Sequence, residues 1–419
     1  CATWNYFCKI IYNAIIERIN SKMQELLIDV TNKQKNILLL ENGKLTERYI
    51  EEEGQERLEG NIYLGIVENV LPGMQAAFVD IGKEKNTFIH IRDILPKVSN
   101  ETGNKNENFS KYNIREYLKE GKPVLVQVKK DSTNKKGARI SAHLSLPGRF
   151  VVIMPNENFI TISQKINNEK ERNRLKEILK KYVPKGFGAI VRTSAVSKSE
   201  EEIASDVEKT INTYKNIKSK YDKAIKEAKN IKPQLLYKSE DIVSRILTDL
   251  MDQDLYRILT NEEKVFKHVH EKLKESKKEI KLEMQENILG MYNIQKQLEE
   301  LENRKVWLKC GGFITIDKTE ALTAIDVNSG KYTGKKDLEQ TIFTVNKEAT
   351  IEIARQLRLR DIGGIIIIDY IDMQDEENEK KIIELFEENL KKDRSKTQIV
   401  GFSKLNLLEM TRKHMCSND

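Results

Sequence analysis

Short apolar runs separated by polar turns fill the chain from Met23 to about residue 142. The runs "MQELLIDV" and "KNILLLENGKLTE" flank a turn at Asn32 and Lys33, a pattern that predicts a β-hairpin. Short alternating strands follow between Gly60 and Ile94, and "KPVLVQVKKDSTNKKGARIS" adds two more. About five short strands with this punctuation predict a small Greek-key barrel of the OB-fold type.

The middle of the chain mixes strand and helix patterns. Strand-like runs, "GRFVVIMPNENFITIS" and "GFGAIVRTSA", enclose a polar helix around Glu169 to Tyr182, which predicts a compact α+β unit. From Ser199 to Lys229 apolar residues recur at every third or fourth position. This period predicts a long helix that ends before Pro233.

The last third of the chain alternates strand and helix patterns. The strands "GGFITIDK" and "ALTAIDVNSG" precede a helix that begins at "LEQTIF", and "IIIID", a charged helix and "KTQIVGF" follow it. This order predicts a βαβ arrangement. Because "GIIIID" is a continuous apolar run rather than an alternating one, we expect a parallel, buried sheet.

Two aspartates follow strand-like runs in this region. Asp326 ends "LTAID" and Asp369 ends "IIIID", with one crossover helix between them, so adjacent parallel strands would place both at the same carboxyl edge. Two close carboxylates repel each other unless a cation lies between them, and oxygen ligands favour Mg²⁺ or Mn²⁺ over zinc. Asn328 could orient a liganding carboxylate. A metal held there would activate water for in-line hydrolysis of a phosphodiester.

Other interpretations of this region stay open on spacing alone. Each aspartate could cap the helix or turn that follows it. Asp372 could hold a second ion, although a solvated or capping role is the commoner one for such a residue. The segment "NSGKYTGKK" resembles a phosphate-binding loop but lacks the Walker spacing, so a nucleotide-binding site is rejected.

Candidate RNA-binding residues lie in the barrel and in the α+β unit. Phe78, Phe88 and His90 follow its strands, with Lys136 and Arg139 near one rim. Aromatic faces beside cations bind single strands in such barrels, but the two phenylalanines could equally be core residues. In the α+β unit, Arg192 and Thr193 could bind a terminal phosphate, or they could be ordinary surface residues.

Composition adds the class of protein and its compartment. At 419 residues, with 39% hydrophobic and 33% charged residues, the chain has material for about two to four packed domains. The 72 Lys and Arg against 65 Asp and Glu give a net charge of +7, whose uneven distribution modestly favours nucleic acid. The cysteines show no close pair at metal spacing, which argues against a disulfide framework or an intact zinc site and fits a cytoplasmic protein. They are Cys1, Cys8, Cys310 and Cys416.

The first 22 residues stand apart from the predicted fold. Their apolar stretch from Ile10 to Ile16 is too short to span a bilayer, and Glu17 and Arg18 follow it without a cleavage pattern for export. We therefore expect no membrane span and no export signal. Residues 1–22 are taken as an extension that is non-native or disordered.

Three strings, "AIDVNSG", "EIARQLRLRDIGGIIIIDYIDM" and "LLEMTRK", resemble the catalytic region of the ribonuclease E/G family. The resemblance extends from Met23 to about Lys413 and implies a multidomain α/β and α+β protein. Its implied boundaries are 23–58 for the first part of a split RNase H-like sheet, 59–142 for an inserted S1 (OB-fold) barrel, 143–237 for a 5′-sensor region, 238–301 for the second part of the RNase H-like sheet, and 302–419 for a DNase I-like α/β catalytic domain.

The same resemblance assigns roles to individual residues. Asp326 and Asp369 would bind the catalytic Mg²⁺, for which Mn²⁺ is an alternative, and Asn328 would orient them. The S1 contacts would be Phe78, Phe88 and Lys136, and Lys396 would lie near the substrate. The sensor of the substrate's 5′-monophosphate would comprise Gly148, Val152, Arg192 and Thr193.

The resemblance implies an endoribonuclease that hydrolyses A/U-rich single-stranded RNA to 5′-phosphate and 3′-hydroxyl products, in the decay of messenger RNA or the maturation of ribosomal RNA. The family continues "LLEMTRK" with a C-P-x-C motif through which two subunits share zinc, whereas this chain reads "HMCSND". We therefore expect no zinc link, a weakened or lost homodimer, and a likeness to the shorter, ribonuclease G-like members. The alternative is a non-catalytic RNA-binding protein built on the S1 barrel.

Overall fold

The computed structural model describes residues 24–52, 57–95, 112–132, 137–227, 230–251, 255–275, 279–330 and 338–415. It divides into two compact units. One unit holds the described residues up to 52 and those from 250 onward, and the other holds those from 57 to 249. Within the described residues, no helix has the length and apolar character needed to cross a membrane.

The first unit begins with the predicted hairpin. Its strands β1 (Gln24–Thr31) and β2 (Gln34–Glu41) are antiparallel, and Asn32 and Lys33 turn the chain with φ of 52° and 65°. The hairpin prediction is confirmed. The hairpin is part of a five-stranded sheet in the order β15-β14-β1-β2-β3, which includes strands from far along the chain. These are β3 (Lys44–Glu52), β14 (Leu255–Thr260) and β15 (Lys281–Met284).

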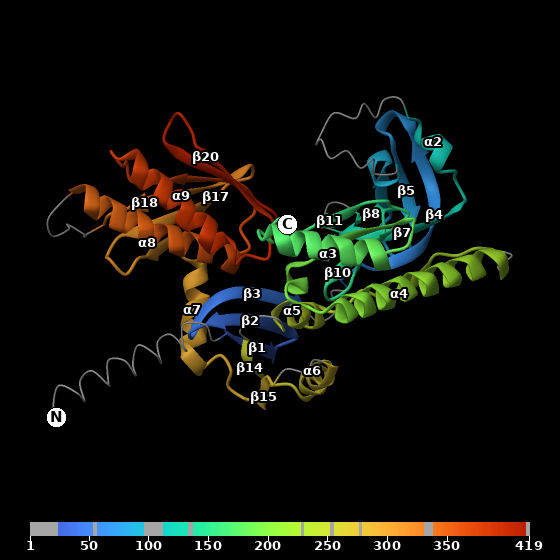
Figure 1. Ribbon diagram of the computed structural model, residues 1–419, viewed down its shortest axis with the longest axis horizontal. Helices are drawn as coiled ribbons and strands as arrows, with labels where there is room; N and C mark the ends of the chain where they lie inside the picture. Colours follow the sequence, from blue (N-terminus) through green and yellow to red (C-terminus); the bar gives the residue numbers. More distant parts are fainter. Residues whose placement is uncertain are drawn as a thin grey trace. The chain divides into compact units, whose positions relative to one another are not determined.

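A second sheet in the same unit carries the two aspartates. Its six strands run in the order β16-β17-β18-β19-β21-β20. Helices α8 (Leu338–Leu359) and α9 (Glu376–Leu390) accompany it (Figure 1). The strands are β16 (Lys305–Trp307), β17 (Phe313–Lys318), β18 (Leu322–Asn328), β19 (Gly364–Asp369), β20 (Thr397–Phe402) and β21 (Leu407–Arg412).

The expectation of a parallel, buried sheet was wrong. Only β18 and β19 pair in parallel, through the crossover α8, whereas the other neighbours are antiparallel. One face packs on the helices in a core that includes Ile366, Ile368 and Phe386. The other face leaves Ile365 52% exposed. The apolar run of β19 thus conceals an alternation, because isoleucine occupies both faces of the strand.

Ion pairs join α8 and the loop before β20 to the hairpin sheet. The buried Glu47 of β3 accepts hydrogen bonds from Arg358 and Arg394. Although burial favours its neutral form, the two guanidinium groups outweigh burial and lower the pKa of the Glu47 carboxyl. Ion pairs at Glu47 therefore connect the hairpin sheet to α8 and to the loop before β20, and Leu359 of α8 adds apolar packing against the same sheet.

The second unit contains the predicted barrel. Strand β4 (Ile62–Leu71) pairs with both β5 (Ala76–Asp80) and β7 (Pro123–Lys130), while β8 (Arg139–Ser141) joins β7 to β6 (Thr87–His90). The five strands close on themselves around an apolar core. A mixed α/β protein with an OB-like barrel is thereby confirmed.

The α+β part of the second unit is a four-stranded sheet with two helices. Helix α4 (Glu200–Glu227) matches the long helix expected from the apolar period, and α3 (Glu169–Tyr182) matches the polar helix. The sheet runs in the order β11-β12-β10-β9. Its strands are β9 (Leu146–Pro147), β10 (Val151–Pro155), β11 (Ile160–Ile162) and β12 (Phe187–Val191).

The remaining short elements link these bodies. Strand β13 extends the barrel sheet beside β4, and α6 packs against β14 and β15. The bounds are α2 (Ile114–Tyr117), β13 (Gln234–Tyr237), α5 (Ile242–Leu250), α6 (Glu263–Glu275) and α7 (Ile294–Glu299).

Candidate active site

The two aspartates lie directly opposite each other on adjacent strands. In the parallel register of β18 and β19, Asp326 is the partner of Asp369. Both side chains are exposed, while Ile325 and Ile368 beside them are buried on the helix side. Because side chains alternate along a strand, the pair points to the face of the sheet that α8 and α9 leave open. The adjacency expected from the two strands is confirmed, although β18 continues two residues beyond Asp326.

Asn328 lies next to Asp326 on the same strand face. Its side-chain amide donates a hydrogen bond to Asp326 Oδ2 at 2.6 Å. A carboxylate held by an amide on one oxygen keeps its remaining lone pairs directed outward. The structure thus brings Asn328 to Asp326, as the orienting role requires.

Electrostatics at the pair favour a cation. Partial burial, then the charges of Asp326 and Asp372, raise the pKa of the Asp369 carboxyl. Among the described residues, the Asp369 side chain has no hydrogen bond or ion pair. The charges that act on its carboxylate, those of Asp326 and Asp372, are both negative. A divalent ion between the two carboxylates would remove this repulsion, and oxygen donors suit Mg²⁺ or Mn²⁺.

The donors supplied by the protein are few. The described part of the chain contains no group of three or more His, Cys, Asp or Glu side chains placed to hold a metal ion. Mg²⁺ commonly binds through one or two carboxylates and keeps several waters, so a carboxylate pair fits this ion better than it fits zinc.

The capping interpretation finds no support in the contacts. Helix α9 has its own N-cap, Asp375, whose Oδ1 accepts from Glu377 N at 2.9 Å. Asp326 lies within β18 rather than at a helix start. The other candidate, Asp372, accepts a hydrogen bond from the Asn406 side chain at 2.8 Å, so part of its bonding capacity is already used.

Lys396 does not join the pair. It is exposed and immediately precedes β20, whose Thr397 is level with Arg412 and hence with Gly364 at the start of β19. Asp369 is five residues further along β19, which is roughly 16 Å at the usual strand rise. Its assignment to the substrate stays a prediction.

On the barrel, Phe78 and Phe88 are cross-strand partners on the outer surface. Both are half-buried rather than core residues, and their ring centroids lie 6.1 Å apart with planes at 66°. Arg139 pairs with Phe88 from the other side and makes an ion pair with Asp93 at 2.9 Å. The barrel therefore presents two aromatic rings beside a cation, the arrangement that binds bases and phosphates. Lys136 lies outside the described residues.

His90 ends the same outer row. Its Nδ1 accepts from Arg92 N at 3.1 Å, and burial followed by the charge of Arg92 lowers the pKa of the imidazole. A neutral ring can stack on a base as the phenylalanines do.

In the α+β sheet, the proposed sensor residues meet at one loop. The Arg192 guanidinium donates to the Gly148 carbonyl at 2.9 Å and pairs with Asp249. Thr193 is exposed next to it, whereas Val152 is half-buried in β10 opposite Ile190. Arg192 and Gly148 are thus brought together, but the arginine charge is already compensated.

The loop explains why glycine occurs at position 148. Asp206 of α4 accepts from the backbone N–H groups of Arg149, Phe150 and Val151 at 3.0, 2.8 and 3.1 Å. A Cβ on Gly148 would lie 2.5 Å from Asp206 Oδ2. Any side chain there would disturb the carboxylate that holds the loop.

Comparisons with known proteins agree on one family. The sequence profile of the "Ribonuclease E/G family" matches residues 145–415, a span that includes both aspartates. This chain belongs to the ribonuclease E/G family. It is 40% identical over 397 residues to "Ribonuclease G" of Salmonella typhimurium (strain SL1344), and 39% identical over 397 residues to that of Escherichia coli (strain K12). Each match covers 93% of this chain and 79% of the relative.

A longer relative shows the same extent of similarity. The chain is 36% identical over 401 residues to "Ribonuclease E" of Nostoc sp. (strain PCC 7120 / SAG 25.82 / UTEX 2576), which covers 92% of this chain and 56% of that protein. The family resemblance stated from three short strings is therefore confirmed over nearly the whole sequence.

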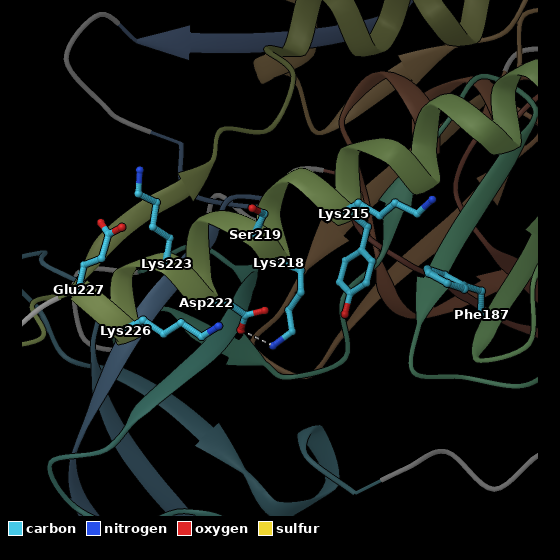
Figure 2. Close-up of a pocket in the computed structure, with 9 residues that line it drawn as sticks. Phe187, Lys215, Lys218, Ser219, Asp222, Lys223, Lys226 and Glu227 are labelled. Atoms are coloured by element: carbon cyan, nitrogen blue, oxygen red, sulfur yellow. Dashed lines mark hydrogen bonds and ion pairs between the residues drawn. The ribbon is translucent and has the colours of Figure 1, made fainter.

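This member of the ribonuclease E/G family also has a lysine-lined cavity that the sequence did not indicate. The cavity, about 540 Å³ in volume, lies along the second half of α4 (Figure 2). Four lysines outnumber Asp222 and Glu227 in its lining, and Lys218 pairs with Asp222 at 2.8 Å. Phe187 from β12 closes one end, with its ring 5.6 Å from that of Tyr214. The lysines are Lys215, Lys218, Lys223 and Lys226.

The second feature that sequence reasoning missed lies beside the aspartate pair. Trp307 of β16 is 60% exposed and pairs with Phe313, which in turn is level with Asn328. Trp307, Phe313 and Asn328 thus form a row of cross-strand partners. Cys310, the cysteine that the structure describes, is not part of this row, and its backbone N–H donates to Glu348. The tryptophan in the short run "KVWL" is the sequence signal that could have revealed this aromatic group.

Proposed function

We propose that this chain is a metal-dependent endoribonuclease that hydrolyses single-stranded RNA. The observation that carries the proposal is the Asp326–Asp369 pair, level in register on the open face of the sheet and flanked by Asn328. Bound there, Mg²⁺ would supply a water molecule of lowered pKa and would offset charge developing on the phosphate. The two carboxylates would hold the ion whose positive charge offsets that of the phosphate, and Asn328 would keep Asp326 oriented.

The products follow from which bond breaks. Oxygen from water attacks the phosphorus, and the bond from phosphorus to the 3′ oxygen breaks. The 3′ oxygen takes up a proton, and the phosphate stays on the downstream fragment. The fragments then carry a 3′-hydroxyl and a 5′-phosphate, as the family resemblance implies.

The second unit supplies the RNA contacts in this proposal. Phe78 and Phe88 stack bases on the outer surface of the barrel, with Arg139 near the phosphates. The family resemblance adds Lys136 as a further RNA contact. Arg192 and Thr193 receive a 5′-monophosphate. Four lysines in the α4 cavity are suited to further backbone phosphates, because exposed lysines bind polyanions without regard to sequence.

The domain assignment is part of the same proposal. The assignment of the five-stranded sheet to a split RNase H-like part is supported by its strands, which come from residues before 53 and after 254. The barrel corresponds to the S1 domain, the α+β part to the sensor region, and the last sheet to the DNase I-like domain. A/U-rich messenger RNA and ribosomal RNA precursors are the proposed substrates, which places the reaction in the cytoplasm.

The rival function is RNA binding without catalysis. The barrel patch fits both functions, but a binding protein has no use for two carboxylates facing each other on an open sheet face. The sharpest test is cleavage of a short, labelled, 5′-monophosphorylated A/U-rich RNA by the chain and by its Asp369→Asn variant, with Mg²⁺ or with a chelator. Cutting by the unaltered chain only, and only with metal, supports the enzyme. Binding by both without cutting by either favours the rival.

A further inference from the structure

An exposed aromatic pair occupies the edge of the catalytic sheet. Trp307 is 60% exposed on the edge strand β16, and its partner Phe313 is half-buried on β17. The ring centroids lie 5.3 Å apart with planes at 62°. Neither side chain belongs to the apolar core between the sheet and its helices. Trp307 therefore contributes little to folding by burial, since burial of an aromatic side chain is what normally stabilises a fold.

A lysine is held against these rings. Lys305 Nζ lies 4.1 Å from the centroid of the Trp307 ring and 3.4 Å from that of Phe313. The ring faces attract the ammonium group, so the cation stays beside the aromatic surface instead of moving freely in solvent. The site thus combines two π surfaces with one positive charge.

The strand register places this group beside the carboxylates. Trp307 is level with Phe313, and Phe313 is level with Asn328. Two residues further along β17, Thr315 is level with Asp326, and Asp326 is level with Asp369. Directly paired residues point to the same face of a sheet, so all these side chains share the open face. Two strand spacings separate Trp307 from Asn328, roughly 10 Å, which is within reach of a nucleotide next to a phosphate at the aspartates.

We propose that Trp307 and Phe313 form a base-stacking subsite for a nucleotide adjacent to the scissile phosphate, with Lys305 meeting a neighbouring phosphate oxygen. This inference rests on the proposed ribonuclease function. Stacking of a base on an aromatic side chain strengthens binding and tolerates any base, because each base has a π face. The subsite positions the strand over the aspartates without selecting a sequence by hydrogen bonds.

Tryptophan fluorescence tests the contact directly. The chain has two tryptophans, Trp4 and Trp307, so a Trp4→Phe variant reports on Trp307 alone. Titration with a 5′-monophosphorylated single-stranded RNA in EDTA, which prevents metal-dependent cutting, should quench this fluorescence saturably. Unchanged fluorescence at saturating RNA would overturn the subsite.

A coupling experiment then tests stacking itself. Trp307→Ala should weaken binding about fivefold or more, and Trp307→Phe should restore most of the affinity. A single abasic nucleotide, moved along the RNA, should abolish the effect of Trp307→Ala at one position only. The matched control is Val400→Ala, since Val400 is 67% exposed on β20 at the opposite edge of the same sheet and should show no such coupling.

The outcomes separate this inference from the proposed function. Coupling without any cleavage by the unaltered chain would keep the subsite and remove the nuclease. Metal-dependent cleavage with equal losses on intact and abasic RNA would remove the subsite and keep the nuclease. A change in oligomeric state of Trp307→Ala, with RNA binding unaltered, would mean that the aromatic edge contacts protein, which also contradicts the proposal.

Discussion

The candidate sites of the two units differ in whether their charged residues have partners of opposite charge. On the open face of the six-stranded sheet of the first unit, Asp326 and Asp369 lie side by side, and no cation among the described side chains pairs with Asp369. In the second unit, Arg139 is paired with Asp93, and Arg192 is paired with Asp249. Asp369 thus faces only like charges, whereas these two arginines are paired with aspartates of their own unit.

This difference separates two ways of preparing a site for a charged ligand. Asp369 lies beside two like charges, so a cation bound at the proposed metal site would relieve a repulsion that the fold imposes. Each arginine already has an aspartate partner, so a phosphate bound there would compete with a carboxylate for the guanidinium charge. In the proposed function, the first arrangement would favour tight binding of one ion, and the second would favour discrimination between RNA ends.

The largest effect should come from breaking the carboxylate pair. Asp369→Asn removes one of two metal-binding carboxylates and should lower cleavage more than about a hundredfold, with RNA affinity retained. The matched change Asp372→Asn should cost less than about tenfold, because that carboxylate is already bound by Asn406. Initial rates at saturating Mg²⁺ compare the two. Equal losses in both variants would contradict the assignment of Asp326 and Asp369 as the metal pair.

The compensated arginine gives the next effect. Arg192→Ala should reduce the preference for 5′-monophosphorylated over 5′-hydroxyl RNA by about tenfold, the size expected for loss of a charged hydrogen bond. Asp249→Asn removes the competing carboxylate charge and should raise the same preference. Cleavage of matched substrates with the two 5′ ends measures both ratios. An unchanged ratio in Arg192→Ala would refute the sensor role.

The α4 lysines should produce a smaller, salt-dependent effect. Changing all four cavity lysines to glutamine should lower the slope of log affinity against log salt concentration by roughly two to three, at about 0.7 per phosphate contacted. The matched control changes Lys264, Lys267, Lys272 and Lys274 of α6, which removes the same charge from a different helix. Filter binding across a salt series reports the slopes. Equal slopes in the two variants would mean that only net charge matters.

The pH dependence should give the smallest shift. Burial, Asp326 and Asp372 raise the pKa of Asp369, so cleavage at limiting Mg²⁺ should fall as pH falls through that value. Asp372→Asn removes one like charge and should move this acid limb to lower pH. A limb that stays in place would exclude Asp372 as a cause.

The same shift has a stability counterpart in the metal-free protein. Because the folded pKa of Asp369 is raised, its protonated form is favoured by folding. The stabilisation is present below the ordinary carboxyl pKa and is lost as pH rises through the raised value. At neutral pH, Asp369→Asn should therefore slightly raise the melting temperature without metal, and added Mg²⁺ should stabilise only the unaltered chain.

Much of the fold could be predicted because it depends on local patterns. The hairpin follows from two apolar runs around Asn32 and Lys33, and α4 follows from a period of three to four residues. The adjacency of Asp326 and Asp369 follows from a strand-helix-strand unit, whose single crossover places its strands in parallel. These predictions required no knowledge of distant contacts.

The misses share a cause. The apolar run of β19 was interpreted as buried on both faces, since hydrophobicity does not reveal which face a helix covers. The position of Lys396 at the other end of the strands from Asp369 depends on the pairing of β20 with β21, which no string reveals, and its role toward the substrate stays a prediction. Asp249, 57 residues from Arg192, could not be recognised as its partner.

The sequence by itself determined the family, the order of the elements and the two aspartates, because each is encoded in contiguous residues. Tertiary structure alone decided which face of the last sheet is open, which arginines are already paired, and that Trp307 and Lys305 share the row of Asp326 and Asp369. Strand pairing and charge compensation join residues far apart in the chain. Such pairings depend on register, and register is fixed only when the whole sheet packs on its helices.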